Sequence, residues 1–345
     1  MSESYEGKQY VGMDLHRRRS VLVRMTETGE HLETMRISND PEYLRAVMAR
    51  AGEAPEVVLE ATYGWYWAVD TLAELGARVH LAHPLGVQMF SYRRVKNDER
   101  DAADLADLLR MGRLPEAWIA PPALRELRGW VRHRAKLVGL RSSLKCQIHA
   151  VLAAAGVTVT TSDLFGVGGT ALLASAQLAA PSRARVESLL RLITALDFEV
   201  ELYTDLLAGR LRGDAGYRAI QAIPGIGPVL AAVFVAEIGD VQRFARPAQL
   251  ASWAGLTPKH HESDTTVHRG RITKQGSRLV RWAAVEAVQR IPAGTELGAR
   301  RERIGARRGR NIGTVAAARE LTELVFFGLR DGHIRRLNPP PTAAA

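Results

Sequence analysis

The segment "QYVGMDLH" (residues 9–16) has the pattern of a short strand and carries an acid, Asp14, within it. Further strand and helix patterns follow as far as residue 84. Strands are expected at 20–30 (ending in an "ETGE" turn), 31–38, 56–62 and 78–84, and helices at 38–52 and 64–77. This order of elements predicts a mixed sheet with helices on its faces.

A dense acidic run follows the sheet pattern, in "RRVKNDERDAADLADLLRMGR" at residues 93–113. Its main acids recur every three residues. Three residues of an α-helix turn through about 300°, so each step drifts back by ~60°, and the acids cannot all point to one spot. These acids are Asp98, Asp101, Asp104 and Asp107. One interpretation is a helix whose first turn carries acids favoured by the helix dipole, with Asn97 as its cap.

Two acids outside the run, Asp14 and Glu60, favour a second interpretation. In a ribonuclease-H-like sheet the first strand is central and the fourth runs parallel beside it. Carboxylates on those two strands can then converge with two carboxylates on the following helix. Such oxygen ligands, without cysteine or clustered histidine, describe a site for Mg²⁺ or Mn²⁺. Two such ions could stabilise the attacking and leaving oxygens in phosphodiester chemistry.

The middle of the chain changes character. Two long helical patterns, 121–156 and 183–211, flank a Gly-rich break, "FGVGG", at residues 165–169. This predicts either an antiparallel helical hairpin, or arm, or an ordinary helical subdomain. Further on, Gly225 and Gly227 precede an apolar helix in "IPGIGPVLAA", a pattern that can present backbone N–H groups to a phosphate. A polar, basic loop between two helices is expected after residue 255.

Composition limits the class of protein. With 345 residues, 46% hydrophobic and 24% charged, the chain is long enough for two globular domains. Lys and Arg outnumber Asp and Glu by 47 to 37, and only six of these cations are Lys. Guanidinium groups suit phosphate, so the charge fits a polyanionic partner, but it fits a merely solvated basic surface equally well. A single cysteine, Cys146, excludes an intramolecular disulfide and a cysteine-built metal site. No membrane span and no signal peptide are expected, and the final "NPPPTAAA" is expected to be disordered.

Five ordered motifs carry a resemblance to a known family: "GMDLH", "LEATYGWYW", "KNDERDAADLA", "IPGIGPVLAA" and "LASWAGLTPKHHES…GRITKQGSRLVR". Over nearly the whole chain, the sequence resembles the IS110-type insertion-sequence transposases, which include the Piv-like invertases. The resemblance implies a RuvC-like (RNase-H-like) α/β domain of the DEDD type at 8–117 and a helical coiled-coil arm at 118–214. It also implies a mostly helical serine transposase domain, with a helix-hairpin-helix-like element, at 215–331. A disordered tail at 332–345 completes the expected organisation.

The resemblance also implies the site residues. The DEDD acids, which would bind Mg²⁺ or Mn²⁺, fall on Asp14, Glu60, Asp98 and Asp101, with Asp104 as an alternative partner of Asp101. Asn97 stands where the family usually has threonine. The nucleophilic serine falls on Ser263; Glu262 replaces the usual preceding serine and Asp264 the usual glycine. Ser252 is a competing serine, which is expected to lie in a packed helix.

The implied mechanism is attack by Ser263 on a scissile phosphodiester, giving a covalent phosphoserine–DNA link. Cations near Ser263 would hold the DNA backbone, although each is also compatible with a solvated basic face. They are Arg269, Arg271, Lys274, Arg278 and Arg281. The implied partners are element-end and target DNA, a structured non-coding guide (bridge) RNA and further copies of the chain in a dimer or tetramer, in the bacterial cytoplasm. The arm and "RRERIGARRGR" (300–310) are candidate RNA contacts.

Two other functions remain open from the sequence. One is a metal-dependent, junction-resolving nuclease that uses water as its nucleophile and forms no covalent intermediate. The other is a catalytically inactive DNA-binding protein, in which the acids are only helix-start and surface charges. Loss of activity in Ser263→Ala distinguishes the recombinase from the nuclease, and metal dependence distinguishes both from the inactive protein.

Overall fold

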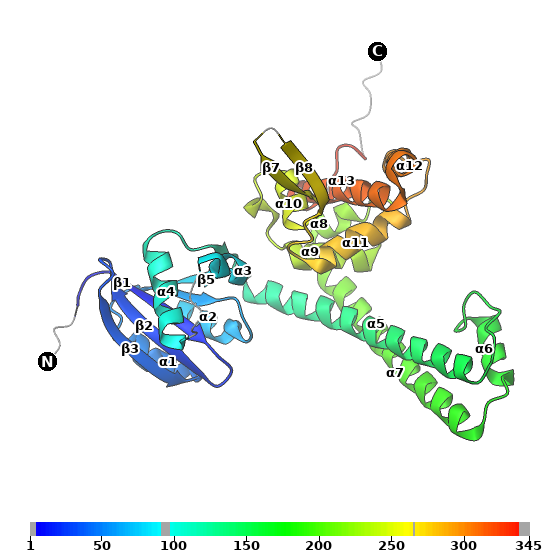
Figure 1. Cartoon of the computed structure of the whole chain (residues 1–345), viewed down its shortest axis with the longest axis horizontal. Coiled ribbons are helices and arrows are strands. Elements are labelled where there is room, and N and C mark those ends of the chain that lie inside the picture. The colour runs from blue at the N-terminus through cyan, green and yellow to red at the C-terminus, as the bar shows by residue number, and fades with distance from the viewer. Residues whose placement is uncertain (1–4, 91–96, 265, 338–345) are drawn as a thin grey trace, which may run out of the picture. The chain divides into compact units, whose positions relative to one another are not determined.

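The structure is a computed structural model of the whole chain and describes residues 5–90, 97–264 and 266–337 (Figure 1). The chain divides into two compact units, Met1–Ala120 and Pro121–Ala345. Each unit has a hydrophobic core of its own.

The N-terminal unit is a mixed α/β sheet, as the strand and helix patterns predicted. Its strands are β1 (Gln9–Leu15), β2 (Arg19–Thr26), β3 (His31–Ser38), β4 (Glu56–Glu60), β5 (Arg78–Ala82) and the two-residue β6 (Glu116–Ala117). Their order across the sheet is β3-β2-β1-β4-β5-β6. β1 pairs antiparallel with β2 and parallel with β4, which itself pairs parallel with β5. The strand that carries Asp14 is therefore central, and the strand that carries Glu60 runs parallel beside it.

Helices cover both faces of this sheet. They are α1 (Pro41–Met48), α2 (Trp65–Glu74), the short α3 (Pro84–Val87) with the 3₁₀ turn η1 (Gln88–Phe90), and α4 (Asp98–Arg110). Buried residues of α1 and α2 share one core with β1, β2 and β3, whereas α4 packs with β4 and β5 in a second cluster. Asp40 caps α1 by accepting hydrogen bonds from the amides of Glu42 and Tyr43, and Asn97 caps α4 by accepting a hydrogen bond from the amide of Glu99.

Gly12 allows α4 to lie directly on β1. A Cβ at this position would lie 1.8 Å from the carbonyl oxygen of Ala102 and 3.0 Å from the amide nitrogen of Ala106. Ala102 and Ala106 are themselves fully buried, so small residues line both sides of the contact. Because β1 carries Asp14 and α4 begins with acids, this contact sets the separation between two acid-bearing elements.

Gly12→Ala is therefore expected to destabilise the protein by about 1–3 kcal/mol, because the added methyl group must push α4 away from the sheet. Urea unfolding followed by circular dichroism would measure the loss. Gly129→Ala is the matched control: a Cβ there meets nothing within 4 Å, and the residue lies inside a helix, so this change should be neutral or stabilising. A Gly12→Ala protein as stable as the wild type would contradict the close packing.

At the start of β4, Glu56 is a buried acid surrounded by cations. Its Oε1 lies 2.9 Å from Nζ of Lys8 and 3.4 Å from Arg78, and its Oε2 lies 2.6 Å from Nε2 of His80. Burial raises the pKa of the Glu56 carboxyl, but the hydrogen bonds from Lys8 and His80 outweigh burial, and the pKa falls below its ordinary value of 4.5. These contacts join β4 and β5 to the segment before β1.

A carboxyl whose pKa is lowered by folding stabilises the folded state above its unfolded pKa, and this stabilisation is lost as the pH falls through the folded pKa. We expect the midpoint temperature of thermal unfolding to decrease as the pH is lowered below 4.5. In Glu56→Gln this decrease in the midpoint temperature should be smaller. Glu42→Gln is the control, because the Glu42 side chain is 82% exposed. Identical profiles for wild type and Glu56→Gln below pH 4.5 would show that this carboxyl is not responsible.

The C-terminal unit begins with the predicted helical hairpin. Its long helices are α5 (Pro122–Ala154) and α7 (Ala180–Leu211) (Figure 1). Ile148 and Leu152, near the end of α5, pack with Val186 near the start of α7. Leu127, near the start of α5, belongs to the same core cluster as Leu207, near the end of α7. The two helices are thus antiparallel.

The Gly-rich stretch at 165–169 is not simply a break, because helix α6 (Val167–Ser175) begins inside it. A Cβ at Gly169 would lie 2.2 Å from the carbonyl carbon of Leu164, so this glycine is required where the chain folds back on itself. Close packing, and not only flexibility, therefore explains glycine at this position.

The rest of the unit is mainly helical, as predicted. Its helices are α8 (Ala215–Ile220), α9 (Pro228–Ile238), the 3₁₀ turn η2 (Val241–Arg243), α10 (Pro247–Trp253), α11 (Arg278–Gln289), α12 (Glu296–Arg308) and α13 (Arg310–Asp331). Buried residues of α8, α9, α10, α11 and α13 form a single core, whose largest fully buried side chains include Phe234 and Phe326. Glu237 at the end of α9 is also buried, and it accepts hydrogen bonds from Arg132 of α5 and Ser277, which caps α11.

The prediction of a loop between α10 and α11 is wrong, because this segment forms the antiparallel hairpin β7 (Pro258–Ser263) and β8 (Thr266–Ile272). Figure 1 shows the hairpin standing out from the helices of its unit. Its residues are mostly polar and exposed, so they lack the alternation of apolar and polar side chains by which a strand is recognised in a sequence.

The expected disordered tail also needs correction. Ile334 is buried in the core, and Arg336 forms ion pairs with Glu296 and Glu320, so the chain is packed to about residue 337. Residues 338–345 lie outside the described part of the chain. Among the described residues, no helix combines the length and apolarity needed to cross a membrane.

Candidate active site

The parallel strands β1 and β4 carry Asp14 and Glu60 to one face of the sheet. Gly12 and Val58 are paired in register, and both face α4. Side chains alternate along a strand, so Asp14 and Glu60, each two residues further on, lie on this same face at the end of the sheet. Both side chains are half-buried.

The first turn of α4 continues the face that packs on the sheet. Ala102 and Leu105 are buried there. Asp98 lies one turn before Ala102, and Asp101 lies one turn before Leu105, so both acids extend the buried stripe beyond the core. The side chain of Asp104 is exposed. The geometry therefore supports the pair Asp98 and Asp101 over the alternative pair that includes Asp104.

A histidine completes the acidic cluster. Nε2 of His16 lies 3.1 Å from Oδ2 of Asp14 and 3.2 Å from Oδ1 of Asp98. One ligand atom from each of these three side chains lies within 4.8 Å of the others. The Asp14 side chain is only 14% exposed, but that of Asp98 is 50% exposed, so the cluster is open to solvent on the α4 side.

The donor set fits a divalent cation. Two carboxylates are suitable ligands for Mg²⁺, and a neutral imidazole extends the choice towards Mn²⁺. In the part of the chain that the structure describes, Glu60 and Asp101 lie outside this group of three. They occupy the neighbouring positions on β4 and α4.

Sequence reasoning missed His16, although it quoted the motif "GMDLH" in which this residue occurs. Its signal was its position: a side chain two residues after a strand acid falls on the same face as that acid. Two other acids of α4 have structural contacts. Glu99 accepts a hydrogen bond from Thr34 and pairs with Arg36, both on β3, and Asp107 pairs with Arg110.

In the C-terminal unit, Ser263 is the last residue of β7. It pairs in register with Thr266 of β8, and its side chain is exposed. Asp264 follows with φ +52°, in the left-handed region. Glycine adopts this region without strain, and aspartate is one of the few other residues that tolerate it. The turn thus explains both the glycine usual in the resembling family and its replacement by aspartate here.

Three cations surround the base of this hairpin: Arg271, Lys274 and Arg278 are exposed, and none has an ion pair within the described ranges. Lys274 has φ +58°, and a Cβ at Gly276 would lie 1.8 Å from the carbonyl oxygen of Trp253. The loop that carries Lys274 is therefore packed tightly on the end of α10.

The other predicted nucleic-acid contacts have different surroundings. Nη1 of Arg281 donates to the backbone carbonyls of Ala254 and Gln275, which gives this residue a structural role. A Cβ at Gly225 would lie 2.3 Å from the carbonyl oxygen of Ala287, so this glycine is required by packing, whereas Gly227 is exposed with open space around it. The side chain of Arg269 lies outside the described part of the chain.

Negative charge also lies beside the serine. The Glu262 side chain is 63% exposed, and its Oε2 lies 3.3 Å from Nε2 of His260, whose positive charge when protonated offsets that of the carboxylate. Ser252 lies in helix α10, as predicted, but its side chain is exposed and not packed. Both serines are therefore exposed, and they differ in position: Ser263 lies beside the turn of the β7–β8 hairpin, whereas Ser252 lies within a helix.

Two family models match the chain. A DEDD-type IS110 model described as "Transposase" matches residues 11–156, and the model "Transposase IS116/IS110/IS902 family" matches residues 217–296. The first match contains the acidic cluster, and a domain of the DEDD type suggests the use of a divalent metal. The second contains the β7–β8 hairpin with Ser263.

Curated proteins are similar over much of the chain. A "Probable family 20 transposase" of Pseudomonas aeruginosa is 28% identical over 236 residues, covering 66% of this chain and 68% of that protein. The "Insertion element IS116 uncharacterized 44.8 kDa protein" of Streptomyces clavuligerus is 25% identical, covering 97% of this chain and 98% of that protein. A "Pilin gene-inverting protein" of Moraxella lacunata is 30% identical over 125 residues, covering 34% of this chain and 38% of that protein.

Proposed function

The chain belongs to the IS110/IS116/IS902 family of transposases, and from this membership we propose that it cuts and rejoins DNA through a phosphoserine intermediate assisted by a divalent cation. The family makes it an enzyme of DNA transposition and recombination. The observation that supports the finer proposal is the acidic cluster: a strand acid and a helix acid meet around His16 at the end of the central strand.

In this proposal the N-terminal unit is an RNase-H-like domain at 8–117, followed by the arm at 118–214 and the serine transposase domain at 215–331. The central β1 and the parallel β4 beside it support the RNase-H-like assignment. Asp14 and Asp98 would hold the cation, with Glu60 and Asp101 at the neighbouring positions. The cation, Mg²⁺ or Mn²⁺, would withdraw charge from the scissile phosphate and so make it more electrophilic.

Ser263 would be the nucleophile. Its Oγ would attack phosphorus and give its proton to water. The bond from phosphorus to a DNA sugar oxygen would break, and that oxygen would take a proton from water and leave as a hydroxyl. When a DNA hydroxyl attacks the phosphoserine, a phosphodiester forms again and Ser263 regains its proton. Arg271, Lys274 and Arg278 would hold the DNA backbone, with Arg269 on the same hairpin; Arg281 would support the loop.

Three further parts of the proposal follow from the family resemblance. They are a guide RNA, an assembly of two or four copies of the chain, and a cytoplasmic location. Recombination of two duplexes requires several strand cuts, which supports more than one copy of the chain. An RNA that pairs with DNA would supply sequence choice, while the protein contacts backbone and shape.

A trapping assay tests the proposal. The protein, Mg²⁺ and labelled DNA carrying the junction of the element ends are incubated with and without the element's RNA, and the products are separated on denaturing gels. A metal-dependent protein–DNA adduct is expected. Metal-dependent cutting without any adduct would instead identify a hydrolytic nuclease.

A further inference from the structure

Helix α12 carries more positive charge than its neighbours neutralise. Residues 296–308 contain five arginines and two glutamates. Arg300 pairs with Glu320 of α13, and Arg301 pairs with Glu302. The remaining arginines of the helix are exposed, as is the first residue of α13, and none of them has an ion pair with any residue that the structure describes. They are Arg303, Arg307, Arg308 and Arg310.

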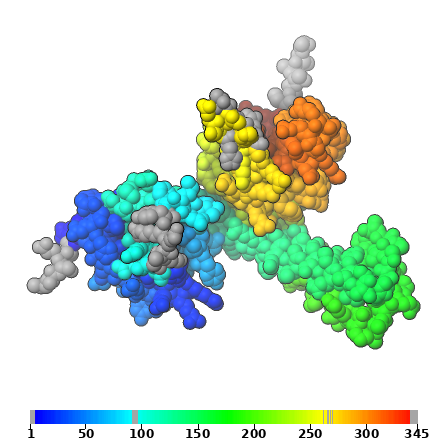
Figure 2. Space-filling model, in the orientation of Figure 1, coloured from blue at the N-terminus to red at the C-terminus, as the bar shows by residue number. Residues whose placement is uncertain are grey.

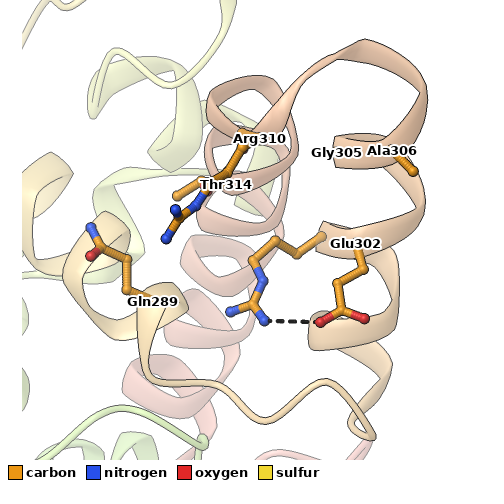
Figure 3. A pocket seen from close by; sticks show the side chains of 7 residues that line it. Gln289, Glu302, Gly305, Ala306, Arg310 and Thr314 are labelled. Atoms are coloured by element: carbon orange, nitrogen blue, oxygen red, sulfur yellow. Dashed lines mark hydrogen bonds and ion pairs between the residues drawn. The ribbon is translucent and has the colours of Figure 1, made fainter.

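One of these arginines, Arg310, lines a hollow of about 360 Å³ between α11, α12 and α13, together with the paired Arg301. Figure 3 shows Arg310 reaching from the start of α13 into the space between the helices, with Thr314 on the next turn of α13 and Gln289 on α11. Glu302 is the acid on the rim, and it is paired with Arg301. The lining thus offers guanidinium, amide and hydroxyl groups and has a net positive charge.

The helices hold this hollow in a fixed shape. A Cβ at Gly313 would lie 2.4 Å from the carbonyl oxygen of Arg301 and 2.9 Å from Cα of Gly305, so α12 and α13 cross in direct backbone contact. Nη1 of Arg301 donates to the carbonyls of Val288 and Ile291 at the end of α11. Arg310, by contrast, has its guanidinium engaged by no hydrogen bond or ion pair in the described part of the chain.

We propose that this hollow and the exposed arginines of α12 bind the phosphodiester backbone of nucleic acid, with Arg310 holding one phosphate in the hollow. A guanidinium donates in a planar fork that matches a phosphate, and Arg303 and Arg307, four residues apart, lie on one helix face as a row of further donors. Figure 2 shows this segment, in orange, on the surface of its unit. The binding is expected to be independent of base sequence, because the arginines involved would contact the backbone phosphates and not the bases.

Apart from Gln289, the residues of the site lie beyond residue 296, outside both segments matched by the family models. It therefore adds a contact surface to the DNA transposition that the family performs, and it requires neither Ser263 nor the acidic cluster. DNA and RNA both contain the phosphodiester groups that the site would bind. Binding experiments with each nucleic acid distinguish between these two partners.

The test measures binding of the full chain in a Ser263→Ala background, so that no covalent step interferes. Fluorescence anisotropy with a 30-base-pair DNA duplex of arbitrary sequence gives Kd at several salt concentrations. Arg310→Gln is expected to weaken binding about tenfold at low salt and to lower the slope of log Kd against log salt by about one. Arg307→Gln should act in the same direction.

Arg319→Gln is the matched control. Arg319 is also on α13 and its side chain is 45% exposed, but it pairs with Glu323 at 3.6 Å. The Arg319→Gln change removes the same charge as Arg310→Gln. It should leave Kd within about twofold of the value for the Ser263→Ala protein. An equal loss in Arg319→Gln would show that only net charge matters, and an unchanged Kd in Arg310→Gln and Arg307→Gln would overturn the proposal.

Two further arms identify the source of the phosphate. A hairpin RNA of unrelated sequence replaces the duplex; a loss in Arg310→Gln with either nucleic acid supports the proposal and assigns the site to that partner. Inorganic phosphate alone is titrated as a competitor. If Arg310→Gln weakens only the binding of free phosphate and leaves DNA and RNA binding unchanged, the hollow is not a backbone site.

Discussion

Ser263→Ala is expected to abolish the protein–DNA adduct and to reduce strand exchange by roughly 10³-fold or more, because no other group would form the covalent link. The serine lies at the end of β7, exposed beside a turn, and the substitution removes one oxygen atom without leaving a cavity. Folding and DNA binding should therefore remain as in the wild type. Denaturing gels measure the adduct, and anisotropy measures the binding.

Ser252→Ala is the matched control for this change. Ser252 is another exposed serine of the same unit, but it lies in α10 and not at the hairpin turn. It should retain the adduct and the strand exchange of the wild type. If Ser252→Ala loses the adduct and Ser263→Ala keeps it, the nucleophile has been assigned to the wrong serine; cutting that survives both changes points to a water nucleophile.

Much of the N-terminal unit could be predicted because its signals are local. The strand at 56–60 is an apolar, β-branched run, and Asp40 caps the helix that lies between the strand at 31–38 and this one. The helices α5 and α7 were equally recognisable from two long helical patterns, which fitted either an antiparallel hairpin or an ordinary helical subdomain; the packing of Ile148 and Leu152 against Val186 decides for the hairpin. In each case, the residues that define the element are neighbours in the sequence.

The hairpin β7–β8 could not be predicted for the opposite reason. Its strands carry polar side chains that remain exposed, so hydrogen bonding between the strands, and not burial, gives it its form. The packed residues after α13 have the same difficulty. Arg336 donates hydrogen bonds to Glu296 and Glu320, which are 40 and 16 residues away in the sequence. No local sequence pattern predicts such pairs.

The acids of the candidate site could be predicted from the sequence, but the spatial arrangement of its residues could not. Asp14 and Glu60 stood at the ends of recognisable strands, whereas the role of His16 depends on where α4 brings Asp98. That placement depends in turn on Gly12, which the sequence offered only as a residue within a strand. Contacts between elements far apart in the chain therefore decide which charged residues meet.

Asp14→Asn is expected to remove the divalent cation site of the N-terminal unit. The Asp14 side chain is only 14% exposed, so it is the least solvated carboxylate of the cluster. An amide of the same shape offers a neutral oxygen where a cation needs a negative one. Mn²⁺ affinity, measured by calorimetry, should fall at least about tenfold, and adduct formation by roughly 10³-fold.

Asp104→Asn is the control that makes this result specific. Asp104 is also an acid of α4, but its side chain is exposed and lies off the stripe that continues to Asp98 and Asp101. It should leave Mn²⁺ affinity and adduct formation near their wild-type values. Were Asp104→Asn to remove Mn²⁺ binding while Asp14→Asn retained it, the cation would sit on the outer face of α4 and the cluster around His16 would be only an ion-paired helix start. Because calorimetry reports binding without catalysis, this outcome remains distinguishable from a failure of the Ser263 proposal.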